Sequence, residues 1–316
     1  MNRLCILLLF FASVLAQPRA HLPFQAISAV VADNDDHRDV YTDEYLMLCS
    51  HLGEFRLLGL VTSYAANARE YDMFVQGRQD MVDMARKCGL QNVPAALAGA
   101  GVRLQRPESN RIEDTRALAL PASHWLVEQA RHAFVDTPLV VVTGGPLTTV
   151  ADAYLIDPSI AEKIVVSGVF GVREIDYNAG LDAWAWTIVL SKFRVLGIPI
   201  GPPKARGKVY MKPPYVPKSR LQKEFKNGCD FFQWMIDKHH PSNTLPDEHD
   251  YDGQAAIPLL QPQYITDVAR FRVEAIDDKG RPRLIPDPKG SVYEALDANQ
   301  DLATAEFWRV MAKVRE

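Results

Sequence analysis

Short apolar runs that alternate with helix-like stretches constrain the fold of this 316-residue chain more than any other feature of its sequence. The runs are rich in β-branched residues and almost continuously apolar, which is typical of strands covered on both faces. We expect these strands at residues 27–32, 55–62, 93–98, 139–143, 164–167 and 195–200. Helical patterns lie between them, at about 43–51, 68–88, 123–134, 148–156 and 182–193. The alternation predicts an α/β fold with a doubly wound, mostly parallel sheet flanked by helices.

The C-terminal third departs from this pattern. A loop rich in proline and lysine begins at Lys204, and we expect one long amphipathic helix after it, at about 218–238. The aromatic residues of this segment are typical of a helix face packed against a core. Beyond it we expect a small antiparallel C-terminal portion and two further helices: a helix from about Asp252, strands across 271–293 with turns at 278–280 and 288–290, and a closing helix at about 302–314.

The first residues have the pattern of a cleavable secretory signal. Arg3 precedes an apolar run over residues 4–15, and Val14 and Ala16 are small enough for a cleavage site. The run is too short to span a bilayer as a stable helix, and the alternative is a buried N-terminal strand or helix. We predict a signal peptide at residues 1–16, followed by a single domain at 17–316. The mature protein is then secreted or periplasmic, with no membrane contact.

The charge balance does not favour nucleic acid or an anionic membrane as a partner. A formal net charge of −4 and a pI near 6.1 give no electrostatic reason to expect nucleic acid or an anionic membrane as a partner. Basic residues cluster between positions 204 and 226, but prolines interleave with them, which favours a solvated loop. We therefore expect a small-molecule partner, and the sequence leaves assembly into a homo-oligomer open.

Three cysteines remain once the signal is removed: Cys49, Cys88 and Cys229. They are widely spaced and fit neither a zinc site nor a disulfide framework. One disulfide among them stays open, but we expect buried free thiols.

Acidic residues cluster directly after the first expected strand. Asp33 and Asp35 are two positions apart, so they share one face of the strand at its carboxyl end. Ligands of doubly wound sheets bind at that end. Converging carboxylates repel one another unless a cation neutralises them, and oxygen ligands favour Ca²⁺ first and Mg²⁺ second. The alternative is a solvated acidic loop that caps the next helix, with Asp43 and Glu44 in its first turn.

Four segments, in this chain order, resemble segments of the nucleoside hydrolase family: residues 58–62 leading to Asn67, residues 142–149 (VTGGPLTT), residues 176–178 (DYN) with Leu181 and Asp182, and residues 252–257 (DGQAAI). The resemblance extends from about Ala29 to the C-terminal helix. It implies an open α/β fold that binds one Ca²⁺ and cleaves the N-glycosidic bond between ribose and a nucleobase. In that family the metal holds the ribose hydroxyls and the attacking water, and a carboxylate removes a proton from the water.

The resemblance also implies roles for individual residues. Asp35 and Asp252 are expected to be metal ligands, together with the main-chain carbonyl of Gly144 or of Thr143. The ribose hydroxyls are expected to contact Asn67, Asp176 and Asn178. Local structural roles are the alternative: a turn residue for Asn67, and helix caps for Asn178 and Asp252.

The chain departs from the family pattern at two places. Tyr41 and Thr42 stand where the family has two adjacent acids, a metal ligand and a base. Nearby acids are candidates to replace them: Asp35, Asp39 and Asp43 for the catalytic carboxylate and Glu44 for the metal. The family's late histidine aligns with Tyr251, which is better suited to stacking on a ring. His249, two residues earlier, is the candidate for protonating the leaving group.

These observations predict a metal-dependent hydrolase of a ribonucleoside or a related ribosyl compound. The Tyr41-Thr42 departure leaves two alternatives open. One is a protein that kept the fold, lost catalysis and serves as a ligand-binding or structural protein. The other is a hydrolase with an altered substrate, in which Asp39, Asp43 and His249 rebuild the site.

Overall fold

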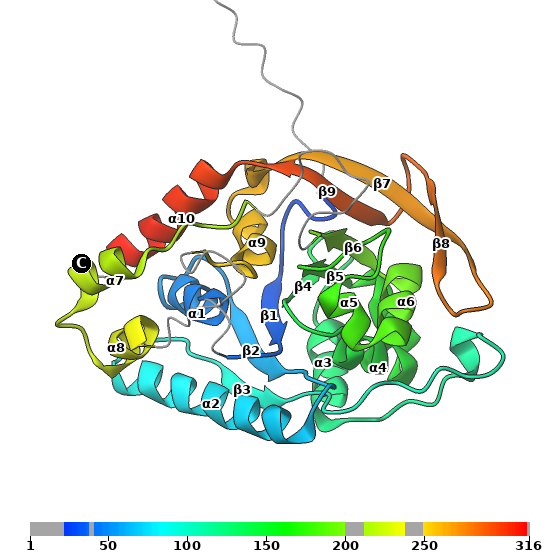
Figure 1. Cartoon of the computed structure of the whole chain (residues 1–316), viewed down its shortest axis with the longest axis horizontal. Helices are drawn as coiled ribbons and strands as arrows, with labels where there is room; N and C mark the ends of the chain where they lie inside the picture. The colour runs from blue at the N-terminus through cyan, green and yellow to red at the C-terminus, as the bar shows by residue number, and fades with distance from the viewer. Residues whose placement is uncertain (1–21, 38–40, 200–211, 238–248, 315–316) are drawn as a thin grey trace, which may run out of the picture.

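The computed structural model describes residues 22–37, 41–199, 212–237 and 249–314. Their strands form one nine-stranded sheet in the order β3-β2-β1-β4-β5-β6-β9-β7-β8 (Figure 1). The strands are β1 (Ala29–Asn34), β2 (Leu57–Thr62), β3 (Ala95–Ala98), β4 (Leu139–Thr143), β5 (Ile164–Gly168), β6 (Arg194–Gly197), β7 (Ile265–Ile276), β8 (Pro282–Pro286) and β9 (Val292–Ala298).

The sheet is mostly parallel, as the sequence predicts. All neighbouring pairs among β1 to β6 are parallel, and β9 lies parallel to β6. The antiparallel portion is confined to β7, which pairs with β8 on one side and β9 on the other. The fold class is therefore confirmed, and the C-terminal strands extend the same sheet rather than forming a separate one.

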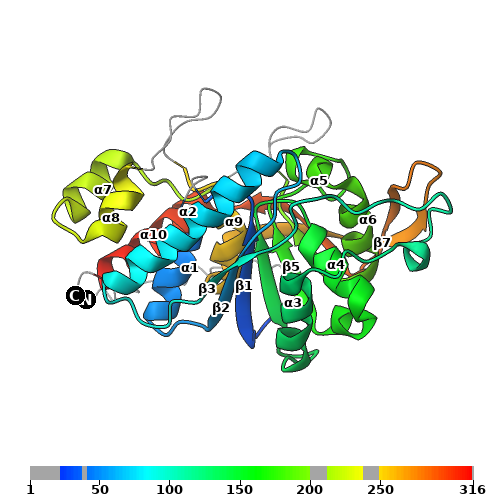
Figure 2. The same ribbon diagram turned by 90° about the horizontal axis from the view of Figure 1, so that it is seen from below.

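Helices cover both faces of the sheet (Figures 1 and 2). Alternate residues of β1 enter two separate cores, because side chains alternate across a strand. Val30 and Ala32 pack with α1, α9 and α10, and Ala29 and Val31 pack with α3, α4 and α6. The α-helices are α1 (Thr42–His51), α2 (Ala68–Lys87), α3 (Pro121–Arg131), α4 (Thr148–Ile156), α5 (Tyr177–Leu181), α6 (Ala183–Lys192), α7 (Lys218–Phe225), α8 (Asp230–Asp237), α9 (Gly253–Ala256) and α10 (Gln300–Lys313). None of the helices in the described ranges is long and apolar enough to cross a membrane.

The prediction of one long helix at 218–238 is wrong, because two helices, α7 and α8, occupy this segment with a break between them. Phe225 and Phe232 stack across the break with ring centroids 4.5 Å apart. A Cβ on Gly228 would lie 2.9 Å from the Cβ of Phe232, so the turn needs glycine for this close approach. Side-chain packing between the two helices therefore overrides the continuous helical pattern.

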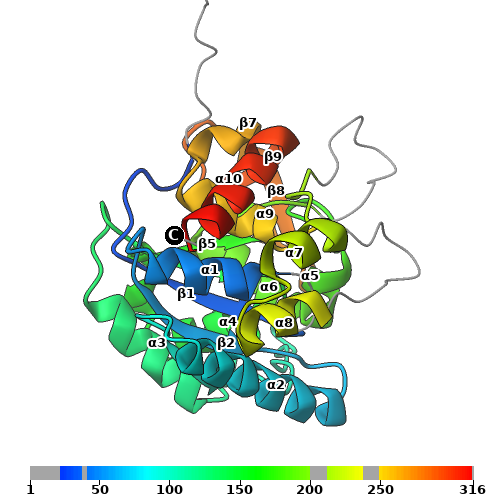
Figure 3. The same ribbon diagram turned by 90° about the vertical axis from the view of Figure 1, so that its left-hand side faces the viewer.

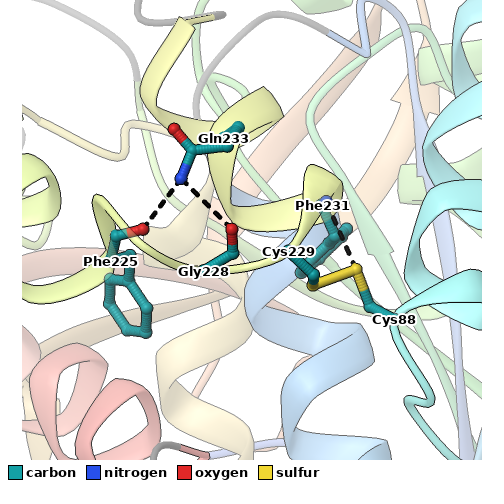
Figure 4. The surroundings of a disulfide bond; sticks show 6 residues. All are labelled: Cys88, Phe225, Gly228, Cys229, Phe231 and Gln233. Atoms are coloured by element: carbon teal, nitrogen blue, oxygen red, sulfur yellow. Dashed lines mark hydrogen bonds between the residues drawn. A yellow bond between two sulfur atoms is a disulfide. The ribbon is translucent and has the colours of Figure 1, made fainter.

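The expectation of free thiols is also wrong for two of the three cysteines. Cys88, the residue after α2, forms a disulfide with Cys229, the residue before α8 (Figure 4). Phe231 N–H donates a hydrogen bond to Cys88 Sγ. The disulfide links α8 to α2, and the two helices lie side by side in Figure 3. Cys49 is free and buried in α1, as expected.

The remaining C-terminal elements agree with the sequence in kind. The helix that follows Asp252 is a single turn, α9, continued by a short 3₁₀ turn at Ile257–Leu259. The turn between β7 and β8 contains Gly280 at φ +73°, a conformation that favours glycine. The expected signal at 1–16 and the basic loop from Lys204 to residue 211 lie outside the described residues.

Candidate functional site

The parallel register brings the polar ends of three central strands to one edge. Asp33 pairs with Val61 of β2 and with Thr143 of β4, and Asn34 pairs with Thr62. All these polar residues are buried. Because the strands are parallel, their carboxyl ends coincide, and the segment carrying Asp35 leaves the sheet beside the turn that follows β4.

That turn, Gly144-Gly145, lies between two aspartates. A Cβ on Gly144 would fall on the carboxylate of Asp252, and a Cβ on Gly145 would lie 2.8 Å from the backbone nitrogen of Asp35. Gly144 N–H donates a 2.6 Å hydrogen bond to Asn34 Oδ1, which fixes the turn against the end of β1. Both glycines are therefore required by close approach. The fold thus brings Asp252 beside Gly144 and Asp35 beside Gly145.

Asp252 directly precedes α9 and is 5% exposed. Its side chain makes no capping hydrogen bond to that helix, so the alternative reading as a helix cap is not supported. Asp35, also 5% exposed, accepts a 2.6 Å hydrogen bond from Asp36 N–H.

A cation at this turn would need main-chain or water ligands as well. Within the described ranges, no three His, Cys, Asp or Glu side chains lie close enough together to hold a metal ion by themselves. Asp252 and Asp35 nevertheless bring two buried carboxyl side chains to this turn, and oxygen ligands are the kind that hard cations prefer. The residues present therefore fit Ca²⁺ in chemistry, but side chains alone do not complete the coordination.

Asp43 has a different environment on the same edge. Its Oδ1 accepts a 2.8 Å hydrogen bond from Asn34 Nδ2, and its Oδ2 accepts a 2.8 Å hydrogen bond from Arg78 Nε. Both side chains of the ion pair are buried. Asp43, one of the candidates for the catalytic carboxylate, is therefore paired with the buried guanidinium of Arg78.

Sequence reasoning missed Arg78, although a signal was present. Arg78 lies on the same stripe of α2 as Phe74, Met81 and Val82, at the spacing of a buried helix face. An arginine on such a stripe indicates a buried acidic partner, because charged side chains are almost never buried unless they are paired.

Asp33 carries a strongly shifted pKa. Burial raises the pKa of its carboxyl to about 7, the Ser63 hydroxyl and Arg78 lower it, and Asp43 raises it. Neither oxygen accepts a hydrogen bond of normal geometry within the described ranges, and the Ser63 hydroxyl is itself 2.5 Å from Thr149 Oγ1. At neutral pH this residue is therefore divided between its protonated and charged forms.

The start of α1 receives a carboxylate from elsewhere in the chain. Asp250 Oδ1 accepts hydrogen bonds from Thr42 Oγ1 at 2.7 Å and from Tyr41 N–H at 3.4 Å. It also accepts a 3.1 Å hydrogen bond from Gly253 N–H at the start of α9. Asp250 thus links the starts of two helices at the positions where the acidic pair is missing. No pattern in the local sequence around Tyr41 indicates that Asp250 binds there.

Two other candidate acids are placed differently. Glu44 is fully buried in the first turn of α1, where it and Asp250 add to the effect of burial in raising the pKa of Tyr41. Asp39 lies outside the described residues.

The three residues expected at the ribose have local partners in the structure. Asn67 is exposed and caps α2 by accepting a 3.0 Å hydrogen bond from Arg69 N–H. Asp176 caps α5 through Ala179 N–H. Asn178 is buried and donates a 2.8 Å hydrogen bond to the carbonyl of Val169.

The leaving-group candidates lie next to each other. His249 forms an isolated bridge with Tyr215, and the two ring centroids are 5.2 Å apart. The Tyr251 ring lies 6.0 Å from the His249 ring. Both candidates are partly buried in the segment that leads into Asp252.

Comparisons with known proteins identify the fold. No family model matches the sequence, and no curated protein matches it. Among solved structures, the plant nucleoside hydrolase PpNRh1 is similar over 90% of this chain and 98% of its own, with 15% identity and a TM-score of 0.63. The inosine-uridine preferring nucleoside hydrolase from Bacillus anthracis is similar over 90% and 99%, with 18% identity and a TM-score of 0.58. The effector protein XOO4466 is similar over 94% and 95%, with 12% identity and a TM-score of 0.58. The chain therefore has a nucleoside hydrolase-like fold.

Proposed function

We propose that this chain is a secreted, Ca²⁺-dependent hydrolase that cleaves the N-glycosidic bond of a ribonucleoside or a related ribosyl compound. The observation that carries the proposal is the approach of Asp35 and Asp252 to the Gly144-Gly145 turn, at the carboxyl edge of a nucleoside hydrolase-like sheet. Solved structures that share the fold over almost their whole length are described as nucleoside hydrolases, which supports the reaction class.

The metal ligands in this proposal are Asp35, Asp252 and the carbonyl of Gly144. A bound Ca²⁺ would orient hydroxyl groups of the sugar and lower the pKa of a water ligand. The glycines allow the Asp252 carboxylate and the backbone of Asp35 to approach this turn, which larger residues would prevent.

Asp35 is the proposed general base, because Asp43 is engaged by Arg78 and Asn34. A carboxylate in this place accepts a proton from the attacking water. The buried acids also place negative charge near the sugar, where it stabilises an oxocarbenium-like transition state.

His249 and Tyr251 are proposed to face the leaving group. An imidazole can donate a proton to a departing base near neutral pH, and a phenol ring beside it can stack on a heterocycle. Asp176 and Asn178 are proposed to orient the ribose, with Asn67 at the edge of the site.

Secretion is supported by the disulfide between Cys88 and Cys229, because disulfides persist mainly in oxidising compartments. The sequence pattern of residues 1–16 is consistent with such a route.

A second candidate function is a binding protein that has lost catalysis. The pairing of Asp43 with Arg78 favours it, since an acid near the start of α1 that could replace the missing pair is already neutralised. Tyr41 and Thr42 themselves bind Asp250 and supply no carboxylate.

Ribose release from inosine and uridine, measured with added Ca²⁺ and with a chelator, tests the proposal. Wild-type protein should release ribose only with Ca²⁺, and Asp35→Asn and Asp252→Asn should abolish release. Asp136→Asn, an exposed aspartate before β4, is the matched control and should behave as wild type.

Calorimetric titration with Ca²⁺ separates the two candidate functions. Binding of Ca²⁺ without ribose release from any nucleoside would favour the binding protein. Ribose release that persists in the chelator would contradict the metal-dependent mechanism.

A further inference from the structure

Arg78 is the largest fully buried side chain in the described part of the chain. A buried guanidinium is costly unless it is paired with an acid and hydrogen-bonded. Arg78 meets acceptors through Nε and Nη1, whereas Nη2 has no hydrogen-bond partner among the described residues. Such a residue is costly for folding, so its contacts indicate what it holds in place. Arg78 lies in the middle of α2, with its head against the ends of β1 and β2.

The contacts of Arg78 join α2 to three other segments: α1, the end of β1 and the end of β2. Nε donates to Asp43 in α1 at 2.8 Å, and Nη1 donates to Thr62 Oγ1 at the end of β2. Nη1 also lies 3.4 Å from the main-chain carbonyls of Asn34 and Asp35. The guanidinium thus contacts the backbone at the last residue of β1 and at the residue that follows it.

The backbone it holds carries the candidate site. Asn34 binds Gly144 N–H with one side-chain atom and Asp43 with another. Asp35 follows it, and its backbone nitrogen adjoins Gly145. Displacement of these two carbonyls would therefore move both Asp35 and the glycine turn relative to Asp252.

We propose that Arg78 is a positioning residue, a fixed internal cation whose guanidinium holds the end of β1 in the geometry that the Asp35–Gly144–Asp252 set needs. Asp43 is then its counter-ion and has no part in proton transfer. The Ca²⁺ part of this inference rests on the proposed function, whereas the geometric part does not.

A purely electrostatic role for Arg78 predicts the opposite change in Ca²⁺ affinity. If Arg78 acted only through its charge, its removal would reduce repulsion of a nearby cation and would tighten Ca²⁺ binding. If it positions the end of β1, its removal weakens Ca²⁺ binding. The sign of the change in affinity therefore separates the two roles.

Three variants and one control divide charge from geometry. Arg78→Lys keeps the charge, but an ammonium cannot reproduce the planar fork that spans Asp43, Thr62 and the two carbonyls. Arg78→Met removes both charge and fork, and Asp43→Asn removes only the counter-ion. Lys87→Met removes an exposed positive charge from the same helix.

The first readout is the exchange rate of the Asp36 amide in metal-free protein, because this N–H donates to the Asp35 carboxylate. We expect exchange at least about tenfold faster in Arg78→Lys and Arg78→Met, since local opening sets this rate. Lys87→Met should exchange as wild type, and Asp43→Asn should exchange more slowly than either Arg78 variant, because its amide oxygen can still accept a hydrogen bond from the guanidinium. Wild-type exchange in Arg78→Lys would overturn the geometric role, and the test proceeds with this variant even if Arg78→Met fails to fold.

The second readout is Ca²⁺ affinity by calorimetry. Both Arg78 variants should bind Ca²⁺ about 10–100-fold more weakly, the usual cost of losing a residue that orients metal ligands. Unchanged or tighter binding in Arg78→Met would overturn the inference. If wild-type protein binds no Ca²⁺, the proposed function fails, and the Asp36 exchange result alone decides the role of Arg78.

Discussion

Two acidic regions on one edge of the sheet differ in how their charge is neutralised. At the glycine turn, Asp35 and Asp252 approach main chain that only glycine allows. In the first turn of α1, Asp43 is instead paired with the buried Arg78. The same residue type therefore has two environments on this edge: the aspartates at the turn lie against main chain, and Asp43 serves as a structural counter-ion.

Removal of the buried Arg78 should have the largest effect on the stability of the protein. Arg78→Met leaves Asp43 charged in a buried place, so the free energy of unfolding should fall by about 3–5 kcal/mol. Urea unfolding followed by circular dichroism measures the change. The double variant Arg78→Met with Asp43→Asn should recover much of the loss, because no unpaired charge remains. A double variant as unstable as the single one would contradict the counter-ion role of Asp43.

Filling the glycine turn should damage the other region without removing any charge. In Gly144→Ala the new Cβ falls on the carboxylate of Asp252, so Ca²⁺ affinity should drop about 100-fold, at the upper end for displaced ligand geometry. Calorimetry measures the affinity. Gly180→Ala is the matched control, since its Cβ would meet only ordinary contact with Ile175. Equal affinities of the two variants would show that the turn is not part of a metal site.

The stability of the metal-free protein should depend on pH through Asp33. Burial raises the folded-state pKa to about 7 from 3.8, so the native state holds a proton that the unfolded state releases. The contribution is complete below pH 3.8 and is lost as the pH rises to about 7. Between pH 5 and pH 7 the loss should be about 2 kcal/mol, since each pKa unit corresponds to about 1.4 kcal/mol.

Asp33→Asn should flatten this part of the stability profile, whereas Asp136→Asn should keep the slope. Urea unfolding at pH 5 and pH 7 measures it. A slope that is the same in wild type and in Asp33→Asn would show that another group titrates in this window.

The smallest effect is expected at the start of α1. Thr42→Val removes the 2.7 Å hydrogen bond to Asp250 and should lower the free energy of unfolding by about 1–2 kcal/mol. Thr42→Ser keeps the hydroxyl and should stay close to wild type. If Thr42→Val were as stable as Thr42→Ser, the hydrogen bond that Thr42 donates to Asp250 would not stabilise this helix start.

Much of the fold followed from local pattern. Strands β1 to β6 and helices α1, α2, α3, α4, α6 and α10 were predictable because their residues follow regular apolar patterns, and the carboxyl edge follows from parallel topology. The placement of Asp35 and Asp252 beside the Gly144-Gly145 turn was predictable in outline, since each of the three segments adjoins the end or the start of a predicted element.

Only the tertiary structure decided which side chains meet across long separations. The pairs Arg78–Asp43, Asp250–Thr42 and Cys88–Cys229 join segments that no local pattern connects. The break at Gly228 likewise follows from how Phe225 meets Phe232. The physical reason is that periodicity and propensity record which face of an element is buried, whereas the charge state and partner of a buried polar group depend on which elements pack against it.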